Sequence, residues 1–278
     1  MSVVNSLELI NRLTKENLDK YCSKADVELI VLYILDIKRS ELYRSNPSVD
    51  KVQLKKIKNF IERRNLGEPI AYMLCNKGFW NLDFIINPSV LIPRPETELL
   101  VEKILSFYNS KPLKLLDLGT GSGAIGLSLL SERPTWEVYC SDSSFDALKV
   151  AKENKENNLV NAHLINADWL SAFENNSFDI IVSNPPYVDK DDTRLLGDGV
   201  LYEPNEALVA KERGLSDLKH IIKHAKAYLK GSGCLLVEHA PEQSKEVIAL
   251  FNNFSYGSIR LFKDLNGDDR VSFGRIES

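Results

Sequence analysis

Four consecutive residues, Asn184-Pro185-Pro186-Tyr187, have the types and the order needed to act on a planar nitrogen. The two prolines donate no N–H and are stiff, so we expect the Asn184 side chain and the Pro185 carbonyl to stand as fixed acceptors. Two such acceptors hold an amide or exocyclic amine and favour a transition state in which positive charge develops on nitrogen. We expect Tyr187 to pack over the substrate plane. The structural alternative is an ordinary turn that ends a strand, with Asn184 capping local backbone.

A second motif lies upstream, where Asp117 to Gly126 runs from an apolar strand through a glycine-rich turn into a helix. Glycines leave room for a ligand on the backbone, and a helix N-terminus presents free N–H groups. Gly121-x-Gly123-x-x-Gly126 matches the dinucleotide fingerprint, and Asp142 ends the next strand, where a carboxylate accepts both ribose hydroxyls. The alternative is a glycine turn needed only for packing the strand against the helix.

Asp117 distinguishes two ligand classes for this loop. A carboxylate entering the loop repels a pyrophosphate but accepts hydrogen bonds from an α-ammonium group, which S-adenosylmethionine carries. After the following strand, we expect Asp168 to accept from the adenine amino group and Trp169 to cover the ring; a core tryptophan is the alternative. Methyl transfer from a sulfonium requires in-line attack at about 3 to 3.5 Å, which suits rigid loops at one sheet edge.

The elements that position these loops fall into three segments. Apolar residues recur at helical spacing from Leu7 to about Gly67, which predicts a small helical bundle in which Ser48 caps one helix. Residues 73–88 contain two short aromatic or β-branched runs around a polar centre, which predict a hairpin connector. We therefore divide the chain into 1–72, 73–88 and 89–278.

The third segment predicts an α/β fold. After a helix that begins behind Pro95, strand-like and helix-like segments alternate, as in a Rossmann-like, mostly parallel sheet covered by helices. Asn266-Gly267 is a strong hairpin signal, so we expect an antiparallel strand at the C-terminal end of the sheet.

Composition excludes several classes of protein. With 278 residues and 44% hydrophobic content, the chain is long enough for about two globular domains. The net charge is −4, so no direct nucleic acid partner is expected. The four cysteines form no C-x-x-C pair, and neither a metal site nor a disulfide framework is expected. We find no export or membrane signal and expect a cytoplasmic monomer.

On these motifs, the sequence resembles the peptide chain release factor glutamine methyltransferases of the PrmC/HemK type, within the class I S-adenosylmethionine-dependent methyltransferases. The resemblance runs from Glu68 to Arg275. The segment from Ile92 to Glu98 is the most distinctive, since generic Asn-Pro-Pro-Tyr enzymes that act on nucleic acids lack it. The matching segments are Glu68 to Tyr72, Phe79-Trp80, Leu91 to Glu98, Asp117 to Gly126, Asp168-Trp169, Asn184 to Tyr187, Glu203-Pro204 and Asp264 to Val271.

The resemblance implies an activity and a set of roles. The family methylates the side-chain amide of the glutamine in the Gly-Gly-Gln loop of class 1 release factors, and its N-terminal bundle helps to dock the release factor. Asn184, Pro185 and Tyr187 would be catalytic, and Asn184 to Tyr187, including Pro186, would hold the glutamine. The methyl donor would be bound by Asp117, Gly119, Thr120, Gly121, Ser122, Gly123, Asp142, Asp168, Trp169 and Asn184.

Two other functions remain open from the residues alone. The same acceptor geometry serves an exocyclic amine of RNA or DNA, so a nucleic acid methyltransferase is the main alternative. A binding module that keeps the cofactor fold as a scaffold is the other.

Several features have no assigned role. His220 and His224 have a metal-binding spacing but are expected on a solvated helix face. The acidic residues after the Asn184 loop are expected to form a solvated loop, a lid or a surface that steers a basic partner; they are Asp189, Asp191, Asp192 and Asp198. Arg94 is expected either to order the cofactor loop as a hydrogen-bond donor or to be a surface residue that precedes the helix. Ala240 departs from the family, which has glycine after the histidine.

Overall fold

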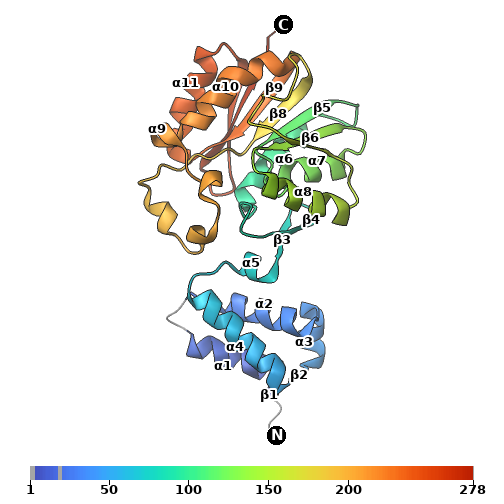
Figure 1. Cartoon of the computed structure of the whole chain (residues 1–278), viewed down its shortest axis with the longest axis vertical. Helices are drawn as coiled ribbons and strands as arrows, with labels where there is room; N and C mark the ends of the chain where they lie inside the picture. Colours follow the sequence, from blue (N-terminus) through green and yellow to red (C-terminus); the bar gives the residue numbers. More distant parts are fainter. Residues whose placement is uncertain (1–3, 18–20, 278) are drawn as a thin grey trace. The chain divides into compact units, whose positions relative to one another are not determined.

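The computed structural model describes residues 4–17 and 21–277. The chain forms two compact units, one made of Met1–Cys75 with Leu196–Tyr202 and the other of Asn76–Leu195 with Glu203–Ser278 (Figure 1). The hairpin region therefore belongs to the second unit, and a short segment from far along the chain belongs to the first. Residues 1–3, 18–20 and 278, which our predicted domain ranges include, lie outside the described part.

The first unit is the predicted helical bundle. Its helices are α1 (Ser6–Glu16), α2 (Lys24–Leu35), α3 (Arg39–Ser45), α4 (Lys51–Asn65) and α5 (Ile70–Leu74), beside the short strand pair β1 (Val4–Asn5) and β2 (Ser48–Val49). Apolar residues spaced three or four apart on α1, α2 and α4 meet in its core, among them Leu9, Leu13, Ile30, Val31, Ile57 and Ile61.

The predicted N-cap of α4 was wrong. Ser48 lies in β2, and Asp50 caps the helix instead, its Oδ1 accepting from the N–H groups of Val52 and Gln53 at 2.8 Å. A carboxylate two residues closer to the helix reaches the free N–H groups that Ser48 cannot.

A buried arginine organises the polar interior of this unit. Arg64 is 7% exposed, and its guanidinium pairs with Asp26 at 3.2 Å and donates to Asp198 Oδ1 at 2.8 Å. Because Asp198 lies in Leu196–Tyr202, the pair ties that segment to the bundle. The Tyr202 hydroxyl adds a hydrogen bond to the Leu66 carbonyl at 3.3 Å.

The second unit is built on a seven-stranded sheet with the order β10-β11-β9-β8-β5-β6-β7. The strands are β5 (Lys114–Leu118), β6 (Glu137–Asp142), β7 (His163–Asn166), β8 (Phe178–Ser183), β9 (Leu229–Glu238), β10 (Gly257–Lys263) and β11 (Asp269–Arg275). The strands from β9 to β7 pair in parallel, while β11 is antiparallel to both of its neighbours. The predicted fold class, including the antiparallel strand near the C-terminus, is confirmed.

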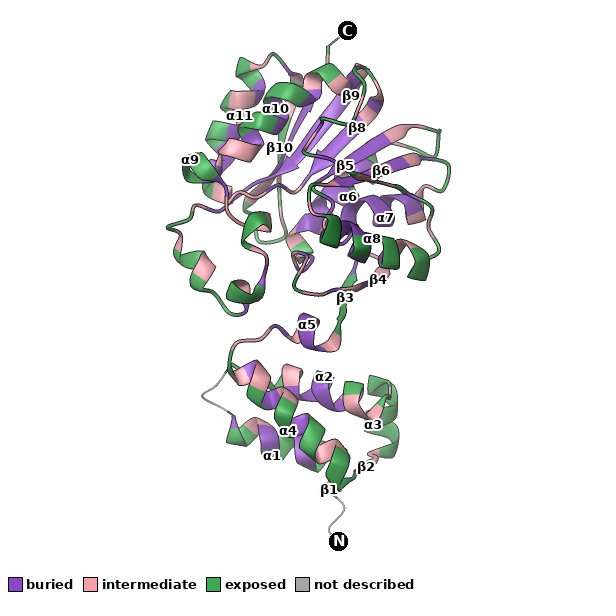
Figure 2. Ribbon diagram, viewed as in Figure 1, coloured by how far each residue is buried: buried purple, intermediate pink, exposed green. Residues whose placement is uncertain are grey.

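Helices cover both faces of the sheet (Figure 1). On one side lie α6 (Glu98–Phe107), α7 (Ala124–Glu132) and α8 (Phe145–Asn157), and on the other α10 (Ser216–Tyr228) and α11 (Ser244–Asn253). The central strands are buried, and the outer surfaces of the helices are exposed (Figure 2). This layering follows from the apolar runs of the strands, which need cover on both faces.

Shorter elements complete the second unit. The predicted hairpin is present as β3 (Asn76–Phe79) paired with β4 (Leu82–Ile85). A short helix, α9 (Lys211–Gly214), precedes α10, and single turns of 3₁₀ helix include η1 (Pro95–Thr97), η2 (Thr193–Leu196), η3 (Val200–Tyr202), η4 (Asn205–Ala207) and η5 (Pro241–Gln243). Ala240, where we expected glycine, has an ordinary φ of −68°, so its backbone tolerates alanine.

Candidate active site

A cavity of about 200 Å³ lies at the carboxyl ends of β5, β6, β7 and β8. This is the edge at which open α/β sheets bind their ligands. Among the predicted site residues, those lining it are Gly119, Thr120, Gly121, Ser122, Asp142, Asp168, Trp169, Asn184 and Pro186. The lining also includes Arg94, which directly precedes η1, Thr97 at the end of η1, and Glu206 from η4. The loops that sequence motifs singled out therefore surround one space.

The glycine loop after β5 owes its shape to close packing. Gly123 has a φ of +87° at the N-cap of α7, a conformation that favours glycine. A β-carbon on Gly126 would overlap Cys140 Sγ and lie 3.1 Å from Asp117 Oδ2, so only glycine allows α7 to approach the sheet this closely. The expected helix N-terminus thus stands at the cavity.

Asp117 does not reach the cavity. It is fully buried, and its Oδ2 accepts from the Thr120 hydroxyl at 2.6 Å and from the Gly126 N–H at 3.0 Å. Burial raises its pKa to about 6. The expected contact with an α-ammonium group is therefore not supported; Asp117 orders the glycine loop from behind.

Asp142 has the geometry of a ribose acceptor. Its Oδ2 accepts from the Gly121 N–H and its Oδ1 from the Ser144 N–H, both at 2.9 Å. These bonds fix the carboxylate at the cavity wall while each oxygen keeps a further lone pair. Burial raises the pKa of Asp142, because its effect is larger than that of the backbone hydrogen bonds, which lower the pKa.

Trp169 lies half-buried against the glycine loop. Gly119 is close enough that a β-carbon there would lie 3.6 Å from the indole. Asp168 beside it is exposed and also lines the cavity. The indole face and the Asp168 carboxylate are thus available to an aromatic base with an amino group.

The Asn184 carboxamide is held by a residue that our sequence analysis did not single out. Its Nδ2 donates to the Thr97 hydroxyl at 3.1 Å, which leaves Oδ1 as the acceptor. Thr97 is 4% exposed and lines the cavity. Thr97 belongs to the segment from Ile92 to Glu98, the most distinctive part of the family resemblance. Membership of that segment is the sequence feature that could have identified Thr97 as a site residue.

Tyr187 points away from the cavity. Its hydroxyl donates to Glu238 Oε1 at 3.0 Å, and its ring packs on the core beneath α10. Pro185 is buried and does not line the cavity either. The expectation that Tyr187 packs over a substrate plane is therefore not supported, because a buried carboxylate on β9 binds its hydroxyl.

Arg94 is anchored by a buried carboxylate. Its guanidinium donates to Glu203 Oε1 at 2.5 Å, and Glu203 Oε2 accepts from the Ile92 N–H at 3.2 Å. Glu203 is 7% exposed. The pair fixes the segment around Arg94, which lines the cavity.

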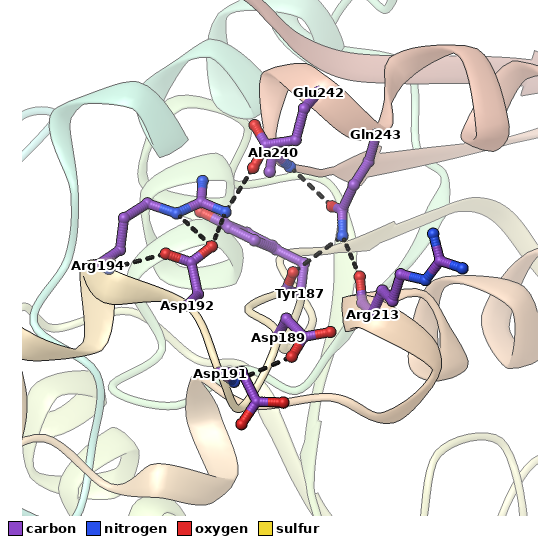
Figure 3. Close-up of polar contacts among 9 residues, drawn as sticks. All are labelled: Tyr187, Asp189, Asp191, Asp192, Arg194, Arg213, Ala240, Glu242 and Gln243. Atoms are coloured by element: carbon purple, nitrogen blue, oxygen red, sulfur yellow. Dashed lines mark hydrogen bonds and ion pairs between the residues drawn. The ribbon is translucent and has the colours of Figure 1, made fainter.

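Gln243 fixes the chain just beyond Asn184 (Figure 3). Its Nε2 donates to the carbonyls of Tyr187 at 2.9 Å and of Arg213 at 3.2 Å, while its Oε1 accepts from the Ala240 N–H at 3.1 Å. One buried amide thus joins the Asn184 loop, α9 and the end of β9.

The four acidic residues after this loop are not gathered in one cluster. Asp192 pairs with Arg194, which also contacts Glu242, and Asp189 Oδ1 accepts from the Asp191 N–H at 2.9 Å (Figure 3). Asp198 belongs to the first unit. Asp192 is thus neutralised by an arginine, and Asp189 is engaged in a local hydrogen bond. This arrangement does not favour a role in steering a basic partner toward the site.

Two further sequence features can be placed. The rings of His220 and His224 lie 4.6 Å apart, and within residues 4–17 and 21–277 no three His, Cys, Asp or Glu side chains are arranged to hold a metal ion. In the same part of the chain, no helix is long and apolar enough to cross a membrane.

The sheet order and the cavity between the glycine loop, Asp142 and Asn184 define a class I S-adenosylmethionine-dependent methyltransferase. Comparison with known families agrees: "Methyltransferase small domain" matches residues 95–211, and "PrmC N-terminal domain" matches residues 10–74. The chain belongs to the family of release factor glutamine methyltransferases, as the sequence motifs predicted.

Curated relatives cover nearly the whole chain. The release factor glutamine methyltransferase of Salmonella typhimurium is 39% identical over 97% of this chain and 96% of its own length. That of Shewanella oneidensis is 39% identical over 90% of this chain and 88% of its own. That of Escherichia coli is 40% identical over 80% of this chain and 81% of its own length.

Solved structures share the fold at low identity. A methyltransferase from Pyrococcus furiosus has a TM-score of 0.55 at 18% identity and covers 80% of this chain and 100% of its own. The T. thermophilus 16S rRNA N2 G1207 methyltransferase, solved with AdoMet and guanosine, has a TM-score of 0.56 at 21% identity. The match covers 73% of this chain and 50% of that protein's chain. These likenesses show the architecture of the second unit and nothing about its substrate.

Proposed function

We propose that this protein transfers a methyl group from S-adenosylmethionine to the side-chain amide nitrogen of the glutamine in the Gly-Gly-Gln motif of class 1 peptide chain release factors. The Asn184 carboxamide carries the proposal, because it is oriented by Thr97 at the wall of a cavity that suits a nucleoside. Relatives with 39 to 40% identity that are named for this reaction support the choice of substrate.

The residues of the cavity fit the methyl donor. Its sulfonium supplies an electrophilic methyl group when bound. Asp142 would accept the ribose hydroxyls with the lone pairs that Gly121 and Ser144 leave free, and Trp169 would cover the adenine. The glycine loop and the start of α7 offer N–H groups to the carboxylate of the methionine portion.

Asn184 and Pro185 would activate the glutamine amide by position. Delocalisation makes an amide nitrogen a poor nucleophile, and two acceptors aligned with its N–H bonds stabilise the positive charge that it gains as it attacks. Asn184 Oδ1, which stands at the cavity wall, is the first proposed acceptor; the Pro185 carbonyl, whose residue does not line the cavity, would have to turn toward it to be the second. The excess proton of the methylated nitrogen leaves to water, so no strong base is needed.

The remaining assignments are proposals about partners and location. The helical first unit would dock the release factor, and the protein would act as a cytoplasmic monomer without direct contact with nucleic acid or membrane. The wide spacing of Cys22, Cys75, Cys140 and Cys234 in the sequence supports the cytoplasmic assignment, because it does not suggest a disulfide framework.

Methyl transfer to defined acceptors tests the function. The protein is incubated with labelled S-adenosylmethionine and an unmethylated release factor, with a Gln-to-Ala variant of the Gly-Gly-Gln motif as matched control. Label in the first acceptor and none in the second is the expected result. Equal labelling of both would reject the proposal, and label only in added RNA or DNA would establish the alternative of a nucleic acid methyltransferase.

Hydrogen exchange of the intact chain tests the docking role. Adding unmethylated release factor is expected to slow amide exchange on the exposed faces of α1 to α4, besides the loops around the cavity. Protection confined to the second unit would contradict a docking role for the bundle.

A further inference from the structure

The orientation of the Asn184 carboxamide decides what it presents to a substrate. With Nδ2 directed at Thr97, Oδ1 remains to accept from the amide N–H groups of glutamine. If the carboxamide were turned over, Asn184 would present its own N–H groups to the N–H groups of the glutamine amide. No acceptor would then face the substrate, and activation would fail. Something must therefore favour one of two nearly isosteric orientations.

Thr97 cannot make this choice alone. A hydroxyl both donates and accepts, so Thr97 serves either orientation of Asn184 unless its proton is committed elsewhere. The group available to take that proton is Glu238, at the end of β9. Glu238 is 1% exposed, and its Oε2 is buried without a hydrogen-bond donor in the described part of the chain.

Two hydroxyl groups, those of Thr97 and Tyr187, interact with Glu238. Tyr187 donates to Glu238 Oε1 at 3.0 Å, and the proximity of Thr97 and Tyr187 lowers the pKa of the carboxyl group. Glu238 Oε2 is thus a buried acceptor without a donor, near a hydroxyl that already accepts from Asn184.

We propose that Glu238 and Thr97 are positioning residues: Glu238 accepts the Thr97 hydroxyl proton, and Thr97 then accepts from Asn184 and holds its oxygen toward the nitrogen to be methylated. The inference rests on the proposed function and deepens it. Both residues would orient the Asn184 acceptor, and neither would take part in the chemical step.

The charge state of Glu238 controls this chain. Its pKa is raised to about 7: burial, the largest effect, raises it, Thr97, Tyr187 and Arg270 on β11 lower it, and Glu96 on η1 raises it. Asp264 partly neutralises Arg270 through a hydrogen bond of 3.2 Å. His239 follows directly after β9, and its ring is bound to Ser272 Oγ and the Ala240 carbonyl.

Protonation reverses the direction of the hydrogen bonds. A protonated Glu238 donates to Thr97, whose own proton is then free to go to Asn184 Oδ1, which favours the unproductive orientation. Turnover is therefore expected to fall as the pH drops through the pKa of Glu238.

Two variants of Thr97 separate the hydroxyl from the shape of the side chain. Thr97→Val keeps the volume and loses the hydroxyl, whereas Thr97→Ser keeps the hydroxyl. We expect Thr97→Val to lower kcat on release factor at least about tenfold and Thr97→Ser to stay within about threefold of wild type. Calorimetry should give the same Kd for S-adenosylmethionine in both, which also shows that each variant is folded.

The pH profile of kcat tests Glu238 itself. Wild type is expected to show an acid limb near pH 7, where the pKa of Glu238 lies. Glu238→Gln should be slow and lack that limb, because its amide donates to Thr97 at every pH. Tyr187→Phe should move the limb to higher pH, since the lost O–H donor had lowered the pKa of Glu238.

The outcomes for the inference and for the function differ. Wild-type kcat in Thr97→Val, or an unchanged acid limb in Glu238→Gln, would overturn the positioning role while leaving release factor methylation intact. Absence of any turnover by wild type on release factor would overturn the proposed function instead.

Discussion

The carbonyl oxygen of Tyr187 lies so close to Gly214 that a β-carbon on the glycine would overlap it. Gly214 has a φ of +81°, and Gln243 binds the same carbonyl at 2.9 Å. The chain that leaves Asn184 is thus fixed by a glycine and a buried amide that follow it in sequence. Rigid placement of Asn184 depends on residues well outside the Asn-Pro-Pro-Tyr motif.

Replacing Gly214 should therefore damage the catalytic loop. Gly214→Ala introduces both the overlap and a disfavoured φ, so we expect a loss of at least about 2 kcal/mol in the free energy of unfolding and a lower kcat. Gly231→Ala is the matched control, since a β-carbon at Gly231 meets no atom within 4 Å. Denaturant unfolding of both variants measures the effect, and equal stabilities would contradict this packing.

Asp142 should govern affinity for the methyl donor. Asp142→Asn keeps the shape but replaces one acceptor oxygen by a donor, so we expect the Kd for S-adenosylmethionine to rise at least about tenfold, or about 1.4 kcal/mol. Asp146→Asn, an exposed carboxylate on α8 paired with Lys149, is the control and should leave the Kd unchanged. Calorimetric titration that finds the same Kd in all three proteins would remove Asp142 from the donor site.

Buried carboxyl groups should make stability fall as the pH rises. In the folded protein the pKa of Glu238 is raised from 4.5 to about 7, and that of Asp117 from 3.8 to about 6. A raised carboxyl pKa means that the folded state binds protons more readily than the unfolded state. The contribution of these two groups to stability is therefore fully present below their unfolded pKa values and is lost as the pH rises through the folded ones.

Glu238→Gln isolates one of these contributions. The rise from 4.5 to about 7 corresponds to about 3 kcal/mol. We expect the variant to be more stable than wild type at pH 8 by up to about this amount and to lose the advantage near pH 4.5. Denaturant unfolding at both pH values measures it. A difference that does not change with pH would contradict an ionised, buried Glu238.

Local patterns predicted the elements and most of the loops of the site. The glycine loop, Asp142, Trp169 and Asn184 each sit at the end of a strand whose apolar run marks it, so sequence alone placed them at one edge of the sheet. Side chains alternate between the two faces of a strand, so Asp117 lies on the face opposite Leu116 and Leu118. Asp117 faces α7, opposite its two neighbours, and therefore lies behind the glycine loop.

Side-chain partners far apart in sequence could not be predicted. Thr97 and Asn184 are 87 positions apart, and Tyr187 and Glu238 are 51 apart, so no periodicity connects them. Arg64 and Asp198 are 134 apart, which is why Leu196–Tyr202 was not expected in the first unit. Such pairs follow from the packing of the sheet and the loops, which a single sequence does not display.

The kinetic effect of Asn184→Ala tests the central claim most directly. If the carboxamide aligns the glutamine amide for attack, the variant should bind S-adenosylmethionine with nearly wild-type Kd while its kcat on release factor falls at least about tenfold. Turnover at the wild-type rate with normal donor binding would contradict a catalytic role for Asn184 and, with it, this account of the site.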